Sequence, residues 1–266
     1  MAAFGVLTEI DMQQTLRSKI DKKIDRNVVV HEVDGTVHGD APDPRLMVSM
    51  TGRDELAPIA AEARHLIGEA AMTNGGEISF HDWKGDSWAV FFSHPADFTP
   101  VCTTELGRTA ALKDEFDKRN TKALALSIDP IEDHRKWAPD IGEVTGTALN
   151  FPIVADPDHR VAELYDMIHP GEGDTSTVRS VFIVDPADKL RLMLTYPKSV
   201  GRNFNEIVRV IDALQATDKA PIATPADWMP GDRVIVGMGV STEDAKQQFE
   251  NVEEFKPYLR YADAPK

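Results

Sequence analysis

The chain has 266 residues, one cysteine and a formal net charge of −15, and 42% of its residues are hydrophobic. A single cysteine excludes an internal disulfide, and the acidic balance leaves no basic stripe that would neutralise nucleic-acid phosphates. The sequence shows no secretory signal pattern at its start and no apolar run near the roughly 18 residues of a membrane helix. We therefore expect a cytoplasmic protein with no nucleic-acid partner and no integral membrane segment.

The first part of the chain differs in pattern from the rest. Apolar residues at positions 12, 16, 20 and 24 predict an amphipathic helix, and residues 54–71 show a second helical pattern that Asn74-Gly75-Gly76 ends. Residues 34–44 (DGTVHGDAPDP) are rich in glycine, proline and aspartate, which is typical of a linker. The first 75 residues include 12 acidic ones, unlike a transit peptide, so import into an organelle is not predicted.

From residue 77 onward, short strand-like runs alternate with longer helical segments, which predicts an α/β fold. The central runs are apolar on both faces, as in a sheet covered by helices, and the last two are close enough to form an antiparallel hairpin. This pattern predicts a mixed sheet with helices on both faces. The expected strands are Glu77–Phe80, Ser87–Ser93, Lys122–Ile128, Phe151–Ala155, Ser180–Asp185 and Leu190–Tyr196, and the expected helices are Cys102–Asn120, Ile131–Ile141, His159–Met167 and Asn203–Lys219.

The pattern changes again near the C-terminus. Prolines at positions 221, 225 and 230 interrupt it, and a strand at Arg233–Met238 and a helix at Ser241–Glu250 follow. These elements predict a small C-terminal unit that is too short to fold alone.

The cysteine lies where a thiol is readily activated. Cys102 follows the expected strand Ser87–Ser93 and opens a helix, where unpaired backbone N–H groups and the helix dipole favour the thiolate. Pro95 and Pro100 stiffen the preceding loop, and Thr99 brings a hydroxyl near the sulfur. The alternative is a buried, inert cysteine, but the polar and proline-rich surroundings favour a reactive one.

Two stretches carry a family resemblance. Residues 81–88 (HDWKGDSW) and 92–108 (FSHPADFTPVCTTELGR) resemble the active-site region of the 1-Cys peroxiredoxins, the peroxiredoxin-6-type subfamily of the AhpC/TSA peroxiredoxins. The resemblance extends over residues 77–261. It implies a thioredoxin-like fold with a mixed central sheet flanked by helices at residues 61–219, a small C-terminal peroxiredoxin unit at 220–266 and an atypical N-terminal extension at 1–60.

The resemblance also implies a site. Cys102 would be the peroxidatic nucleophile, whose thiolate reacts with peroxide to give a sulfenic acid. Arg179 would stabilise the charge that develops on the peroxide, Thr99 would hydrogen-bond the thiolate or the peroxide, and Pro95 would shield the sulfenic acid. Three further positions match the family near the pocket, namely His94, Glu105 and Arg202.

A single cysteine leaves no resolving thiol in the chain. The reductant must therefore be external, either glutathione, ascorbate or a partner thiol protein, and the sulfenic acid should be prone to overoxidation. The resemblance implies hydrogen peroxide and organic or lipid hydroperoxides as substrates. It also implies a homodimer. No cofactor is expected. The histidines at positions 31, 38, 65, 134, 159 and 169 show no metal-ligand spacing, so no metal is expected either.

The same subfamily has been associated with a phospholipase A2-like activity that uses a serine, a histidine and an aspartate. Ser87 and His81 match two of these positions, but Ala187 stands at the third, flanked by Asp185 and Asp188. We favour a structural interpretation, in which Ser87 follows the turn that starts a strand.

Two other classes of function stay open at this point. Cys102 could be the acyl nucleophile of a Cys–His hydrolase with His94 or His134 as its base, although the sequence has no distinctive motif of that class. A redox-sensing or holdase-type interaction protein is the non-enzymatic alternative.

Overall fold

A computed structural model describes residues 70–72, 77–169, 171 and 174–264, all within the compact unit Thr51–Lys266. The predicted 12–24 helix, the linker and most of the 54–71 helix lie outside these residues. Among the described residues, none of the helices combines the length and the hydrophobicity that spanning a membrane requires.

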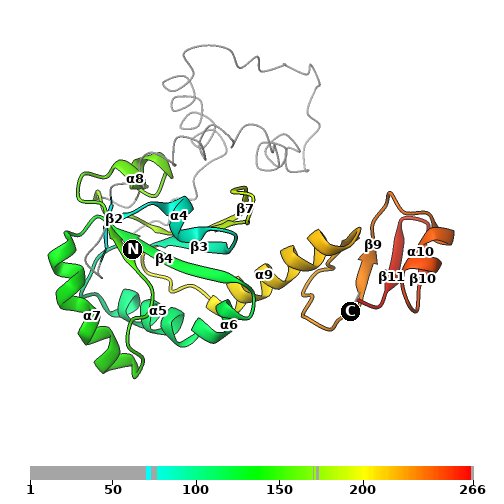
Figure 1. Cartoon of the computed structure of the whole chain (residues 1–266), viewed down its shortest axis with the longest axis horizontal. Coiled ribbons are helices and arrows are strands. Elements are labelled where there is room, and N and C mark those ends of the chain that lie inside the picture. The colour runs from blue at the N-terminus through cyan, green and yellow to red at the C-terminus, as the bar shows by residue number, and fades with distance from the viewer. Residues whose placement is uncertain (1–69, 73–76, 170, 172–173, 265–266) are drawn as a thin grey trace, which may run out of the picture. The chain divides into compact units, whose positions relative to one another are not determined.

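A seven-stranded mixed sheet forms the centre of the fold, as predicted (Figure 1). Its strands are β1 (Ala70–Met72), β2 (Glu77–Ile78), β3 (Trp88–Ser93), β4 (Thr121–Ser127), β5 (Ile153–Ala155), β6 (Arg179–Val184) and β7 (Leu190–Tyr196), in the spatial order β2-β1-β5-β4-β3-β6-β7. Strand β3 pairs in parallel with β4 and antiparallel with β6, and β6 and β7 form the predicted antiparallel hairpin. Strands β3 and β6 are buried along their whole length.

Helices cover both faces of this sheet. They are α4 (Phe80–Lys84), α5 (Pro100–Ala111), α6 (Lys113–Asp117), α7 (Ile131–Thr145), α8 (Arg160–Leu164) and α9 (Phe204–Lys219). Side chains alternate along β3, so Val90 and Phe92 pack in one core cluster with α5, α7 and α9. Ala89 and Phe91 pack in the other cluster, with residues of α4 and α8. The β3–α5 connection, which precedes Cys102, therefore starts from a strand that is buried along its whole length.

Three predictions about elements were wrong. The expected strand Glu77–Phe80 ends at Ile78, because Phe80 begins the short helix α4. The expected helix 102–120 begins at Pro100 and is divided at Leu112 into α5 and α6. The last residues of the 54–71 helical pattern instead belong to β1, which pairs with β2 and β5. The sheet therefore contains a first strand pair that the sequence pattern did not predict.

The C-terminal residues form a second, four-stranded sheet. Its elements are β8 (Ile222–Ala223), β9 (Val234–Val236), α10 (Thr242–Gln248), β10 (Glu253–Lys256) and β11 (Leu259–Ala262), in the order β10-β11-β9-β8. The predicted strand and helix are confirmed, while β8, β10 and β11 were not predicted. Ile222, Trp228 and Val234 form a small core that packs against Ala213 and Ala216 of α9, so this sheet depends on the preceding helix.

Candidate active site around Cys102

Cys102 lies in the first turn of α5, the position that its sequence context predicts. Thr99 is the N-cap residue and Pro100 occupies the first helical position, where its missing N–H costs nothing. The cysteine side chain is fully buried. The free N–H groups and the positive end of the helix dipole favour a thiolate at this point.

Arg179 is the nearest charged neighbour of the sulfur. From the first residue of β6, its Nη1 atom donates to Cys102 Sγ at 3.4 Å and to Glu105 Oε2 at 2.7 Å. Its Nε and Nη2 atoms both donate to the carbonyl oxygen of Lys198, at 2.9 and 2.7 Å. The guanidinium group is therefore fixed on two sides and presents a donor to the sulfur.

Glu105 joins this arginine to a second one. It lies on α5 close to Cys102, and it accepts from Arg202 Nε at 3.0 Å, Arg202 Nη2 at 2.6 Å and the Arg202 backbone N–H at 2.8 Å. Burial raises the pKa of Glu105, but the hydrogen bonds and charge of Arg202 outweigh this effect and hold the pKa below its usual value. The carboxylate is therefore ionised in its buried position.

The charges of this group favour a thiolate. Arg179 and Arg202 carry two positive charges and Glu105 carries one negative charge, and all three side chains are buried. An uncompensated buried charge is costly, and a Cys102 thiolate would bring these four side chains to neutrality. Arg202 is held further by the carbonyl oxygens of Ser93 and Ser180.

The loop before α5 contains the remaining predicted residues. Pro95 is buried, and the Thr99 hydroxyl donates to the carbonyl oxygen of Ala96 at 2.8 Å. His94 Nε2 lies 2.9 Å from Asp97 Oδ1, and the other carboxylate oxygen is 2.5 Å from His134 Nδ1. The structure thus places Cys102, Arg179, Glu105 and Arg202 in one bonded group, and His94 in an adjacent one.

Sequence reasoning missed Asp97 as a residue of interest. Its three-residue spacing from His94 was a visible signal, but its pairing with His134 depends on the packing of α7 and could not be read from the chain. Both histidines bind Asp97, and neither is a hydrogen-bond partner of Cys102 in the described part of the chain. The hydrolase alternative, in which one of them activates the cysteine, therefore has no geometric support.

The residues matched to the phospholipase-like activity do not assemble as a triad. His81 Nδ1 is 3.0 Å from Asp188 Oδ2, so the neighbour of Ala187 supplies the acidic partner from the β6–β7 turn. The Ser87 hydroxyl instead donates to Asn120 Oδ1 at 3.1 Å. Burial raises the pKa of Asp188, but Lys84 and His81 outweigh it and hold the pKa below its usual value.

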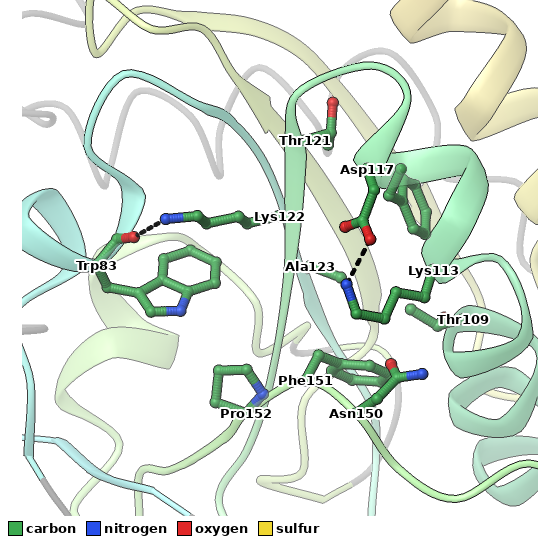
Figure 2. Close-up of a pocket in the computed structure, with 11 residues that line it drawn as sticks. Trp83, Thr109, Lys113, Asp117, Thr121, Lys122, Ala123, Asn150, Phe151 and Pro152 are labelled. Carbon is green, nitrogen blue, oxygen red and sulfur yellow. Dashed lines mark hydrogen bonds and ion pairs between the residues drawn. The ribbon is translucent and has the colours of Figure 1, made fainter.

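A pocket of about 130 Å³ lies elsewhere in the fold (Figure 2). Its polar side chains are already paired: Lys122 donates to the carbonyl oxygen of Trp83, and Lys113 donates to Asp117. Apolar atoms of Phe116 and other core residues line much of the rest. It includes none of the residues that surround Cys102, so we assign it no part in the chemistry.

Two family models match parts of this chain. A model of the AhpC/TSA family matches residues 62–193, and a model of the C-terminal domain of 1-Cys peroxiredoxin matches residues 213–251. The chain is 53% identical to a 1-Cys peroxiredoxin of Dictyostelium discoideum over 191 residues, which are 71% of this chain and 79% of that protein.

Solved structures show the same similarity. A mutant of peroxiredoxin 6 from Arenicola marina is 48% identical, with a TM-score of 0.70 over 74% of this chain and 94% of that one. A yeast mitochondrial 1-Cys peroxiredoxin, described for thiol resolving via glutathione/thioredoxin systems, is 50% identical, with a TM-score of 0.69 over 73% and 94%. The predicted thioredoxin-like fold is thereby confirmed.

Proposed function

Because the chain belongs to the 1-Cys peroxiredoxins of the AhpC/TSA family and is a thiol-dependent peroxidase, we propose that Cys102 is the residue that peroxide oxidises. The observation that carries this assignment is the 3.4 Å contact between Arg179 Nη1 and Cys102 Sγ at the start of a helix. A cation and a helix N-terminus both stabilise the thiolate, which is the reactive form.

The first half-reaction is a displacement at oxygen. The Cys102 sulfur attacks one peroxide oxygen, the O–O bond breaks, and the departing oxygen takes up a proton and leaves as water or an alcohol. The cysteine is oxidised to a sulfenic acid and the peroxide, either hydrogen peroxide or an organic or lipid hydroperoxide, is reduced. Arg179 stabilises the negative charge in the transition state, and Glu105 and Arg202 hold Arg179 in place.

Residues of the preceding loop complete the proposed pocket. The Thr99 hydroxyl now donates to the carbonyl oxygen of Ala96, and it would exchange this bond for one to a peroxide oxygen. The buried Pro95 would exclude water from the pocket. His94 takes part indirectly, through its bond to Asp97. No metal or cofactor enters this proposed mechanism.

An external thiol completes the cycle, since the chain has one cysteine. A first thiol attacks the sulfenic acid, water leaves, and a mixed disulfide forms; a second thiol attacks that disulfide and releases Cys102 as a thiol. We propose glutathione or a partner thiol protein as the reductant. Support comes from the yeast relative, whose resolving is described via glutathione/thioredoxin systems.

We also propose a homodimer in the cytoplasm, with the domain division 1–60, 61–219 and 220–266. Analytical ultracentrifugation, cell fractionation and limited proteolysis test these three points. A monomer at micromolar concentration would contradict the dimer.

Trapping the sulfenic acid tests the main proposal. Reduced protein is mixed with less than one equivalent of hydrogen peroxide, and dimedone labelling of Cys102 is timed by mass spectrometry, with Cys102→Ser as the unlabelled control. We expect labelling far faster than that of free cysteine at the same thiolate fraction. A labelling rate equal to that of free cysteine would contradict the proposal. Acylation of the protein by ester probes would favour a hydrolase instead.

A further inference from the structure

A second buried group of charged side chains lies beside the Cys102 site. Asp97 is held between two histidines: His94 Nε2 is 2.9 Å from Oδ1, and His134 Nδ1 is 2.5 Å from Oδ2. The side chains of all three residues are at most 1% exposed. We call these three residues the clamp.

The hydrogen-bond partners assign the protons of the clamp. His134 Nδ1 faces a carboxylate oxygen, which only accepts, so this nitrogen donates to Asp97, and His134 Nε2 lies 3.3 Å from the carbonyl oxygen of Val154. His94 donates through Nε2, while its buried Nδ1 has no partner among the described residues.

Asp97 is the acceptor at the centre of the clamp. Burial raises the pKa of Asp97, but the hydrogen bonds from His134 and His94 hold it below its usual value, so the carboxylate is ionised. Burial lowers the pKa of His94, which agrees with a neutral ring. The buried carboxylate is stable in the interior only while the two histidines donate to it.

The clamp joins the loop before α5 to other elements. His94 and Asp97 belong to residues 94–99, the segment between β3 and α5, which we call the cysteine loop. His134 belongs to α7, and the Asp97 backbone N–H donates to Asp129 Oδ2 at 3.0 Å. Thr99, the last residue of the loop, is the N-cap of α5, so a movement of Asp97 would also move the turn that contains Cys102.

We propose that Asp97 is a positioning residue, and that its hydrogen bonds to His94 and His134 hold the cysteine loop in the closed arrangement in which Cys102 is buried. Breaking the clamp then governs how fast an external thiol reaches the oxidised sulfur. Cys102 has no exposed surface in the closed arrangement, so any reactant needs an opening, and glutathione or a protein thiol needs a much wider one than hydrogen peroxide does. The inference rests on the proposed role of Cys102.

The clamp should act on the two half-reactions in opposite directions. The closed loop positions Thr99 and the helix turn for attack on peroxide, so loosening it slows oxidation. The same loosening admits the thiol that attacks the sulfenic acid and displaces water, so it speeds reduction. A residue with a general structural role would not produce this split.

Asp97→Asn tests the inference with little change in shape. The amide has one acceptor oxygen, so it cannot accept from both histidines. Stopped-flow tryptophan fluorescence can follow both steps, since the ring of Trp137 lies 5.4 Å from that of His94. We expect oxidation by hydrogen peroxide to slow roughly tenfold and reduction of the sulfenic acid by glutathione to accelerate roughly tenfold.

Two further variants make the test decisive. His134→Phe keeps a ring at this position but removes the donor toward Asp97, and it should shift both rates in the same directions. Asp156→Asn is the control for general destabilisation, because Asp156 is a buried carboxylate that accepts from two backbone N–H groups of α8, away from the cysteine loop. It should lower the melting temperature while changing both rates less than twofold.

The outcomes separate the inference from the proposed function. Reduction that is unchanged or slower in folded Asp97→Asn, or equally accelerated in Asp156→Asn, overturns the clamp while Cys102 keeps its role. Loss of native circular dichroism in both clamp variants, or one Zn²⁺ bound per wild-type chain and lost in Asp97→Asn, also overturns it. A wild-type Cys102 that peroxide does not oxidise overturns the proposed function and the inference together.

Discussion

Two regions of the molecule have the residue types of catalytic groups, and they differ in how completely those residues are enclosed. Around Cys102, the side chains of Arg179, Arg202 and Glu105 are at most 3% exposed and hold one another in place. At the β6–β7 turn, the side chains of His81 and Asp188 are 24% and 27% exposed. Charges act strongly where water is excluded, so enclosure rather than residue type distinguishes the first region, the proposed reaction site, from the second.

The largest difference in the rate of peroxide reduction should be between a variant that lacks the nucleophile of the first region and one that lacks the serine of the second. Cys102→Ser should abolish peroxide reduction, because the hydroxyl that replaces the thiol is not ionised at neutral pH. Ser87→Ala should leave the rate of peroxide reduction unchanged, since Ser87 is bonded to Asn120. A coupled assay with glutathione measures both. Residual turnover in Cys102→Ser would show that another group carries the chemistry.

Arg179→Ala should have the next largest effect. Loss of a single charged donor at a developing negative charge typically slows a reaction by 10²–10³-fold, and we expect a decrease of that order in the rate of Cys102 oxidation. Glu105 would keep its bonds to Arg202, so the fold should survive.

The matched control for this change is Arg191→Ala, which removes an arginine that pairs with Asp218 on the surface. It should oxidise at the wild-type rate. Stopped-flow oxidation by hydrogen peroxide compares the two variants, and an undiminished rate in Arg179→Ala would remove that residue from the site.

The same contrast explains what could be predicted from the sequence. Cys102 at a helix start, the strands β3 and β6 and the hairpin to β7 follow from local patterns, so they could be predicted from the chain. Glu105 binds arginines that are 74 and 97 positions away, and Asp97 binds a histidine that is 37 positions away. These bonds form only when distant segments pack, so they could not be predicted from the sequence.

Errors in the predicted elements have a similar origin. Phe80 comes two residues after the end of β2 and its own propensity suits a strand, yet it begins the five-residue helix α4, where it packs into a core cluster. Residues 70 and 71 continue a helical pattern, but pairing with β2 and β5 makes them a strand. Tertiary pairing overrode local preference in both places.

Glu105→Gln should lower the thermal stability of the protein, because Glu105 bridges two buried arginines. It leaves two buried guanidinium groups without their carboxylate, and breaking such a pair costs about 3 kcal/mol, or roughly 10 °C in melting temperature for a domain of this size. Differential scanning calorimetry measures the change. Glu115→Gln, on the exposed surface of α6, is the control and should melt near the wild-type temperature.

The pH dependence gives this prediction a sign. The folded-state pKa of Glu105 is held below its unfolded value, so its contribution to stability is fully present above the unfolded pKa of about 4.3 and is lost as pH falls through the folded value. The difference in unfolding free energy between wild type and Glu105→Gln should therefore be constant at neutral pH and shrink in acid. A difference that grows as the pH falls would contradict an ionised, bridging Glu105.

The smallest effect should come from Asp188→Asn in the less enclosed region. Asp188 lies in the partly open β6–β7 turn, and its partners on α4 are the partly exposed His81 and the buried Lys84, whose ammonium also donates to three backbone carbonyl oxygens. Because those carbonyls keep the buried ammonium hydrogen-bonded, we expect a loss of unfolding free energy of about 1–2 kcal/mol by urea denaturation, with the rates of Cys102 oxidation and reduction unchanged. A variant that oxidised Cys102 much more slowly would show that the two regions are coupled across the sheet, which enclosure alone does not predict.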